Sequence, residues 1–392
     1  MSPLAFLLDR RDRFEADGRF AAIVLAGTYG WGDADLPHFP PRSLAEIVFE
    51  PVISYPLQWL RAGGAARAVV CANGSAGALR ARLGTSHHGL TLTYAADRFP
   101  RGPAGCLRDA AAMVNGDQVV VVESTVIPTC NLGELLRAHR DSGAALTVVT
   151  APMVRGDEPG PAGIYVVDRR AVDHVAAAGF QDIKEGMIPQ LARAGSRVAA
   201  FASPEPCPRV GDLDSYLHVN QWMVERLVST TESAAVQRWV RRGEHLTHPS
   251  AVVHPSALLM GPTVIGPGAQ VGADATIVGP TVIGTDAIVA AGAQVSRSVV
   301  GPGSFVASQA MVHQCVLAAG SFIEPGAHLH HTAPERARSR RALPRREWDA
   351  AARPELDDAS RPATVLPIRA ARPLHVAATR GDGLSKEEVI GA

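Results

Sequence analysis

The C-terminal half of the chain contains a short repeat, and residues 264–295 read VIGPGAQVGADATIVGPTVIGTDAIVAAGAQV. An aliphatic residue returns at every sixth position, from Ile265 to Val295, and small residues, glycines and prolines fill most positions between. A period of six differs from the 3.6 residues of a helical turn and from the two-residue alternation of a strand. It indicates a triangular coil of three short strands, each turning one aliphatic side chain inward.

The repeat continues on both sides of this stretch, over His248–His331, with two one-residue deletions. Each coil can bury its inner face only against the next coil, so the repeat predicts a solenoid, and about 80 residues give roughly four to five coils. Glycine permits the sharp corners, where positive φ is often required. The stretch resembles the hexapeptide-repeat, left-handed parallel β-helix. The expected inward-facing residues are Val253, Leu259, Ile265, Val271, Ile277, Ile283, Val289, Val295, Val300, Val306, Val312, Leu317, Ile323 and Leu329.

The chain before the repeat has a different pattern, in which short apolar runs alternate with amphipathic stretches. Such alternation predicts an α/β domain with a mostly parallel sheet, whose ligands bind at the carboxyl ends of the strands. We expect strands at Phe20–Leu25, Ala68–Cys71, Leu90–Tyr94, Gln118–Val122 and Ala145–Thr150. We expect helices at Val52–Arg61, Ser75–Leu83, Gly105–Val114 and Leu132–Asp141.

These patterns divide the chain into five segments. They are an N-terminal extension (1–19), the α/β domain (20–220), a helical connection (221–247), the β-helix (248–331) and an Arg- and Pro-rich tail (332–392). The apolar residues of Asp214–Leu246 are spaced as in one or two amphipathic helices, which would pack the two domains together. The composition of the tail is typical of a disordered segment. Its arginines, from Arg336 to Arg346, are expected to be solvated, with contact to an acidic polymer as the alternative.

Composition argues against several classes of protein. The 38 basic and 38 acidic residues cancel, so charge gives no reason to expect a nucleic-acid partner. The five cysteines are odd in number and form no CxxC motif, which favours buried thiols in a reducing compartment. The apolar run Pro3–Leu8 is too short for a signal peptide, and no stretch approaches the length of a membrane span. We expect a cytoplasmic protein.

Five motifs stand in order along the α/β region. Leu25-Ala26-Gly27 opens a Gly-rich loop that includes Gly30, and Asp97 precedes Arg101-Gly102-Pro103-Ala104-Gly105. Gly160–Val166, Asp182–Leu191 and Gly211–Leu217 follow. In this order, with the β-helix behind them, the motifs resemble the sugar-nucleotide pyrophosphorylases, or NDP-sugar synthases. Several members of that family join a Rossmann-like nucleotidyltransferase domain to a C-terminal left-handed β-helix.

The resemblance implies a reaction in which a sugar 1-phosphate attacks the α-phosphorus of a nucleoside triphosphate and pyrophosphate leaves. Positioning, basic side chains and Mg²⁺ would carry that reaction. It implies a catalytic role for Arg42 and metal binding by Glu123 and Asp212. Sugar contacts would come from Gly163, Lys184 and Glu185. Nucleotide contacts would come from Leu25, Ala26, Gly27, Gly30, Asp97, Gly102, Ala104 and Gly105.

The sequence departs from the family pattern at its charged positions. The family's two metal aspartates fall at Thr125 and Arg209, and its loop arginine falls at Gly32. Arg42 stands where the family has a lysine, and residues 1–183 contain no lysine. The exchanges at Thr125 and Arg209 remove negative charge and add positive charge, whereas Mg²⁺ requires oxygen ligands. Glu123 and Asp212 are the acids that would have to substitute.

Three functions therefore stay open. The first is an enzyme that makes an NDP-sugar for polysaccharide synthesis. The second is a catalytically inactive regulatory or scaffolding paralogue, which binds a nucleotide, a sugar phosphate or an active subunit. The third is a β-helix acyltransferase with His313 as its base, although exposed corner histidines such as His328, His330 and His331 are the simpler interpretation. By resemblance, the β-helix is expected to mediate a homo- or hetero-oligomer.

Overall fold

The computed structural model describes residues 20–27, 31, 39–97, 101–153, 159–230, 239–334 and 365–367. The extension 1–19, the two glycines Gly30 and Gly32, and most of the tail lie outside the described residues, as does the side chain of Asp97. Within the tail, β27 (Thr332–Pro334) and β28 (Val365–Pro367) pair antiparallel. No helix in the described ranges has the length and apolar character needed to cross a membrane.

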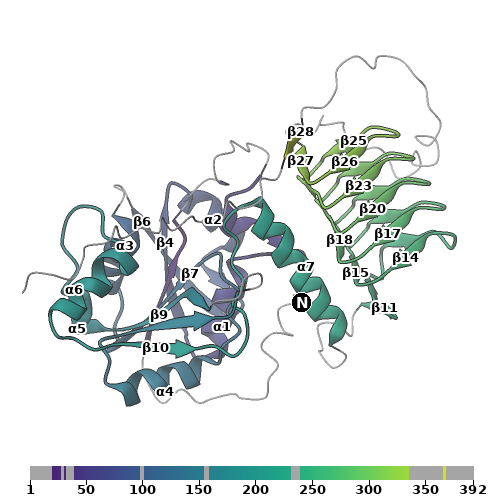
Figure 1. Ribbon diagram of the computed structural model, residues 1–392. Helices are drawn as coiled ribbons and strands as arrows, with labels where there is room; N and C mark the ends of the chain where they lie inside the picture. Colours follow the sequence, from purple (N-terminus) through teal and green to yellow (C-terminus); the bar gives the residue numbers. More distant parts are fainter. Residues whose placement is uncertain are drawn as a thin grey trace, which may run out of the picture.

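The N-terminal domain is built on one eight-stranded sheet of order β10-β8-β9-β7-β1-β4-β6-β5 (Figure 1). The central strands β7, β1, β4 and β6 run parallel, whereas β9 runs antiparallel to both of its neighbours. The predicted α/β class is thus confirmed, and each predicted strand is present. The strands are β1 (Phe20–Leu25), β4 (Arg67–Asn73), β5 (Ser86–His87), β6 (Leu90–Asp97), β7 (Gln118–Glu123), β8 (Leu146–Ala151), β9 (Gly160–Asp168) and β10 (Val198–Ala202).

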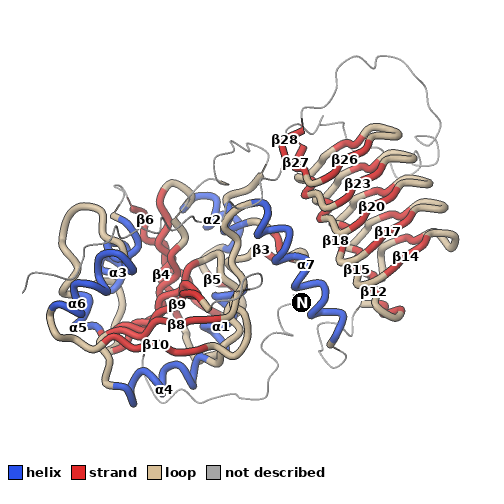
Figure 2. Tube along the Cα trace, in the orientation of Figure 1, coloured by secondary structure: helices blue, strands red, loops and turns tan. Residues whose placement is uncertain are grey.

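Helices cover both faces of this sheet, as the blue segments of Figure 2 show. One face packs against α1 (Ser54–Ala62), α2 (Ala76–Leu83) and α4 (Leu132–Ser142). The other packs against α3 (Gly102–Ala111), α5 (Arg169–Val172) and α6 (Ile188–Arg193). Helix α3 begins three residues before the predicted start, because the proline at its first turn needs no hydrogen-bond acceptor there. The short elements are η2 (Arg42–Leu44), β2 (Glu46–Ile47), β3 (Glu50–Pro51) and the π-helix η3 (Ile183–Met187).

The C-terminal domain is a parallel β-helix of three sheets. Partners in successive coils are 17 or 18 positions apart, as in Val264↔Val282 and Val282↔Val299. The middle of each inner face is fully buried, for example at Ile277 and Val295. The left-handed β-helix predicted from the sequence is confirmed. The first sheet contains β12 (His245–Thr247), β15 (Thr263–Ile265), β18 (Thr281–Ile283), β21 (Val299–Val300) and β24 (Val316–Leu317). The second sheet contains β13 (Val252–Val253), β16 (Gln270–Val271), β19 (Ile288–Val289), β22 (Phe305–Val306) and β25 (Phe322–Ile323). The third sheet contains β14 (Leu258–Met260), β17 (Thr276–Val278), β20 (Gln294–Ser296), β23 (Met311–His313) and β26 (His328–His330).

The connection between the domains is one helix followed by a hairpin. Helix α7 (Leu213–Ser229) begins after Asp212, which caps it. Further along the chain, β11 (Val240–Arg242) pairs antiparallel with β12. The helix predicted as far as Leu246 is therefore wrong in its second half. The hairpin adds β11 to the edge of the sheet that contains β15. Without this pairing, the backbone donors and acceptors of the β12 edge would be exposed.

Helix α7 joins the two domains into one core (Figure 1). Its Met223 is fully buried and belongs to the same cluster as Val264 and Val282, which face outward from the β-helix. The Gln221 amide donates to the Arg297 carbonyl at 2.8 Å, and the Asn220 amide oxygen accepts from the Val48 backbone at 3.1 Å. The helix thus contacts the β-helix and the β2–β3 hairpin region through polar as well as apolar groups.

A histidine on β5 should make stability depend on pH. The His87 Nε2 atom lies 2.9 Å from the Ser54 hydroxyl, which is fully buried. Burial, followed by the neighbouring His88 and Arg82, lowers the pKa of His87 from 6.5 to about 4. Between these two pH values the unfolded chain takes up a proton that the folded chain does not, so stability is lost as pH falls. After allowance for solvent screening, we expect a loss of about 1–2 kcal/mol.

Urea unfolding at several pH values between about 7 and 4 measures this loss. The variant His87→Gln should lose less stability than the natural chain over that interval. The exposed His174 provides the matched control, and His174→Gln should leave the pH profile unchanged. Equal pH profiles for His87→Gln and the natural protein would contradict the assignment.

Candidate functional site

The predicted nucleotide loop begins at the carboxyl edge of the central strands. Leu25 ends β1 and lies beside Glu123, which ends β7. The amide of Ala26 donates to the Cys71 carbonyl at 2.8 Å, and the amide of Ser124 donates to the Leu25 carbonyl at 2.9 Å. This edge therefore brings Leu25, Ala26 and Gly27 together with Glu123, where ligands of parallel α/β sheets bind.

The predicted base-binding loop packs against the segment that contains Lys184. Gly102 has φ +72°, and a Cβ there would lie 2.4 Å from the Gln181 carbonyl oxygen, so only glycine permits this approach. The amide of Ala104 donates to the same carbonyl at 3.0 Å. Gly105 follows inside α3. The predicted base-binding loop is thus in direct backbone contact with the residue that precedes the Asp182–Leu191 motif.

The π-helix η3 carries the two charged residues of the predicted sugar site. The Asp182 carboxylate caps it by accepting from the backbone amides of Lys184 and Glu185, at 2.6 and 2.8 Å. Both of these side chains are exposed. Interruptions of this kind in helices are frequent at functional sites, and this one directs a lysine and a glutamate away from the core.

Glu123 is held by close contacts on two sides. Gly163 has φ +77°, and a Cβ there would lie 2.8 Å from the Glu123 carboxyl carbon, so this turn of β9 requires glycine. On another side, the Arg209 guanidinium donates to a Glu123 carboxylate oxygen at 2.9 Å. The sequence placed Gly163 in the sugar site, and the structure shows it contacting the acid at the end of β7.

The buried Tyr165 lies close to this group of charged residues. Burial raises its pKa above the ordinary value; the nearby carboxylates of Glu123 and Asp182 raise it further, and Arg209 lowers it. The tyrosine is therefore close to charged residues from three separate segments of the chain. Sequence reasoning did not single out Tyr165, although it stands two residues after Gly163 in the motif Gly160–Val166.

The two positions assigned to the family's metal aspartates are neighbours. The amide of Val210 donates to the Thr125 carbonyl at 3.0 Å, and Val126 bridges with Arg209. The amide of Ile127 donates to Pro208 at 2.8 Å. The structure therefore brings Thr125 and Arg209 together from loops 84 positions apart in sequence.

Arg42 and Asp212 are both used to position α7. The Arg42 guanidinium donates to the Gly211 carbonyl. The Asp212 carboxylate accepts from the Ser215 backbone at 2.8 Å and from its hydroxyl at 2.6 Å, which forms a helix N-cap. Beside them, the buried hydroxyls of Ser43 and Ser124 share a hydrogen bond of 2.8 Å. This serine pair, which the sequence analysis missed, ties η2 to the end of β7.

Three histidines of the β-helix, His313, His330 and His331, form a separate cluster on the last coils. The His313 Nδ1 atom lies 2.7 Å from the Ser296 hydroxyl, and its ring stacks on His330 at 4.7 Å between centroids. Burial lowers the pKa of His313, and so do His330, His331 and Arg297. A lowered pKa makes His313 a weaker base than an ordinary histidine, which does not favour the acyltransferase hypothesis.

Comparison with known proteins identifies both parts of the chain. A family model described as "Nucleotidyl transferase" matches residues 21–181, and one described as "Bacterial transferase hexapeptide (six repeats)" matches residues 262–297. The chain is 24% identical to mannose-1-phosphate guanylyltransferase of Mycobacterium tuberculosis, over 62% of this chain and 74% of that protein. It is 27% identical to glucose-1-phosphate thymidylyltransferase of Streptomyces griseus, over 62% and 77%.

A match to mannose-1-phosphate guanyltransferase of Debaryomyces hansenii, 28% identical, covers 38% of this chain and 41% of that protein. By their names, these relatives all transfer a nucleotidyl group to a sugar 1-phosphate. The order of motifs, the contact between the two loops and the C-terminal β-helix agree with these matches. Residues 21–181 thus match the nucleotidyl transferase family, and the chain resembles NDP-sugar synthases, with a hexapeptide-repeat β-helix as its C-terminal domain.

Proposed function

We propose that this protein is a regulatory member of its family, which binds a nucleotide or an NDP-sugar without carrying out the nucleotidyl transfer. The observation that supports this proposal is the ion pair between Glu123 and Arg209. It lies at the edge of the sheet beside the predicted nucleotide loop. A guanidinium at this place favours phosphate binding and disfavours metal binding.

The donor atoms around Glu123 do not fit a divalent metal ion. The family generally works with such an ion, but here the Glu123 carboxylate is bound to a permanently charged guanidinium. The carboxylate of Asp212 is occupied as a helix cap. In the described part of the chain, no group of three His, Cys, Asp or Glu residues is placed to hold a metal. A hard ion such as Mg²⁺ needs several oxygen ligands, which this arrangement does not offer.

The same ion pair supports binding of a polyphosphate. Arginine offers five N–H donors and forms bidentate pairs with phosphate oxygens. Arg209 is partly exposed, with 43% of its side-chain surface accessible, so donors remain available beside its contact with Glu123. Binding therefore requires no metal in this proposal.

Titration with nucleoside triphosphates and NDP-sugars, by calorimetry, tests the proposal. We expect one class of nucleotide to bind equally well with Mg²⁺ and with a chelator. No pyrophosphate should be released from a panel of triphosphates and sugar 1-phosphates. Release with one defined pair of substrates, Mg²⁺-dependent and lost in Glu123→Ala, would contradict the proposal and establish an NDP-sugar synthase with a rearranged metal site.

Exchanging the charge at Arg209 should reverse the metal dependence. The variant Arg209→Asp removes the guanidinium and leaves Glu123 beside a second carboxylate, so metal-free nucleotide affinity should fall at least about tenfold, as for a lost charged hydrogen bond. Added Mg²⁺ should restore part of that affinity. The matched control is Arg193→Asp on the exposed end of α6, which should change neither quantity. An Arg209→Asp variant that binds like the natural protein would exclude Arg209 from the site.

We also propose that the β-helix carries a contact to a second copy of the chain. One of its sheets is covered by α7, but the outer face of the sheet β14-β17-β20-β23-β26 exposes Leu258, Met260 and Met311. Each is 39–52% accessible. Leu258 and Met260 lie on β14 and Met311 on β23, so the apolar side chains extend along one exposed face, as at a protein interface.

Light scattering after size exclusion tests this contact. The double variant Leu258→Glu and Met311→Glu should convert an oligomer into a monomer without loss of secondary structure. The control Val252→Glu places the same charge on the exposed face of another sheet of the same β-helix. A natural protein that is monomeric at every concentration would contradict the proposal.

A further inference from the structure

Two of the five cysteines lie close together, in the segments that lead to and from the candidate site. Cys130 follows the β7 loop and Cys207 precedes Arg209, and both are free and buried. Both belong to one buried cluster, and each thiol shifts the pKa of the other. Among the other cysteines, the Cys71 thiol donates to the Cys106 backbone carbonyl at 3.7 Å.

The backbone around the two thiols holds the loops in register. The amide of Ile127 donates to Pro208, and the Thr129 hydroxyl donates to the Pro206 carbonyl at 2.9 Å. The same hydroxyl lies 3.3 Å from the Cys207 sulfur. Cys130 is fixed independently, because its carbonyl accepts from the Trp59 indole at 2.7 Å. The fold thus holds the backbones of the two cysteines close together, with the Cys207 sulfur against the residue that precedes Cys130.

We infer that Cys130 and Cys207 form an oxidisable dithiol, which peroxide converts into an intramolecular disulfide linking the β7 loop to the Arg209 loop. The Cys207 thiolate attacks one peroxide oxygen, the O–O bond breaks, and a sulfenic acid and hydroxide form. The Cys130 sulfur then attacks the Cys207 sulfur, the S–OH bond breaks, and water leaves with the Cys130 proton. In sum, two thiols and one hydrogen peroxide give one disulfide and two waters.

The surroundings shift the pKa values of the two thiols in opposite directions. The hydrogen bond from Cys130, together with those involving Thr129 and Ser203, lowers the pKa of Cys207 to about 6, although burial opposes this. The pKa of Cys130 is raised by its bond to Cys207 and by burial. Cys207 is thus the nucleophile, because the thiolate is the reactive form, and Cys130 is the resolving thiol. Cys207 is 8% exposed, which favours a small oxidant such as peroxide over a bulky disulfide.

The disulfide would act on the site through chain connectivity. Arg209 stands two residues after Cys207, and Glu123 stands seven before Cys130. A covalent bond between the loops would hold Arg209 opposite Glu123, which is the arrangement that the metal-free function uses. The dithiol itself, however, does not depend on that function, since its formation is measured on sulfur alone.

Treatment of the full-length protein with hydrogen peroxide tests the inference. Thiols titrated after denaturation should fall from five to three, and the mass should decrease by two hydrogen atoms. Peptide mapping should find Cys130 joined to Cys207, and a reductant should reverse the change. Because the bond closes a long loop, the melting temperature should rise by about 5 °C.

Three variants separate the possible outcomes. Cys130→Ser and Cys207→Ser should each abolish the linked peptide, and Cys130→Ser should leave a sulfenic acid at Cys207 that a dimedone probe detects. Cys315→Ala removes a thiol from the β-helix core and should leave the linkage intact. A Cys71–Cys106 linkage, or five unreacted thiols at peroxide concentrations that oxidise the denatured chain, would overturn the inference. Nucleotide binding measured on the reduced protein is unaffected by either result, so the two proposals fail separately.

Discussion

The variant Val282→Asp should lose about 3–5 kcal/mol of stability, the cost of an unpaired charge or protonated acid in an apolar interface. Val282 is the central residue of β18 and is 4% exposed, although it faces away from the interior of the β-helix. It is buried because Met223 and neighbouring residues of α7 cover that face. The aspartate would have no partner of opposite charge among these apolar side chains.

Chemical unfolding followed by circular dichroism measures the loss for Val282→Asp. The matched control is Val252→Asp, because Val252 also faces outward from the β-helix but is 51% exposed. The control should change stability by less than about 0.5 kcal/mol, as at ordinary surface positions. Equal effects at the two valines would show that α7 does not cover this sheet in solution.

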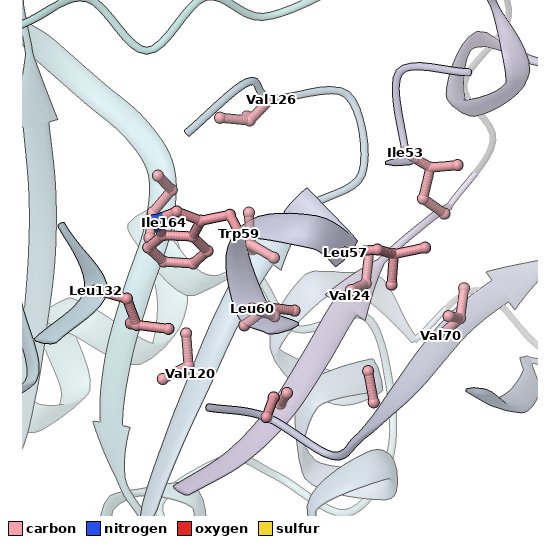
Figure 3. Packing of buried hydrophobic residues seen from close by; sticks show 14 of the residues in the cluster. Val24, Ile53, Leu57, Trp59, Leu60, Val70, Val120, Val126, Leu132 and Ile164 are labelled. Atoms are coloured by element: carbon pink, nitrogen blue, oxygen red, sulfur yellow. The ribbon is translucent and has the colours of Figure 1, made fainter. Parts of the chain in front are cut away.

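The variant Trp59→Ala should destabilise the N-terminal domain by about 3–5 kcal/mol, as expected for removal of a large core side chain. Trp59 lies on α1 and is 3% exposed. Figure 3 shows its ring beside Ile164 of β9, with Leu132 of α4 nearby. The substitution therefore leaves a cavity and also leaves the Cys130 carbonyl without its indole donor.

Two further variants divide this effect into its parts. Trp59→Phe keeps much of the apolar contact but removes the indole donor, so its loss should be about 1–3 kcal/mol. Phe180→Ala serves as the control, because Phe180 is 59% exposed and should contribute little. A loss below about 1 kcal/mol for Trp59→Ala would contradict the packing around α1.

Local patterns were sufficient for most elements and failed where a neighbouring segment changed the outcome. The repeat of the β-helix could be predicted because every coil makes the same contacts with the next one. Val240 was assigned to a helix because its apolar spacing fits one, but it pairs with Thr247 in a hairpin. Pairing with the edge of a sheet overrides a weak helical pattern, and the position of that edge is not encoded within residues 240–247.

The candidate site shows the same division. Gly102 and Gly163 could be singled out from the family motifs, and the structure gives the reason, since each meets a neighbour too closely for a Cβ. The contact between Arg209 and Glu123 could not be predicted, because the two residues are 86 positions apart and neither sequence neighbourhood specifies the other. For the same reason the pairing of Cys130 with Cys207 was not foreseen.

The sequence by itself determined the two domain folds and the resemblance to NDP-sugar synthases, because a period of six and an ordered set of loop motifs are local properties of the chain. Only the tertiary structure decided what the charged residues do. Arg42 and Asp212 position α7, and Arg209 neutralises Glu123. The physical reason is that the charge around a carboxylate depends on every segment folded against it, so its capacity to hold a metal follows from the assembled site.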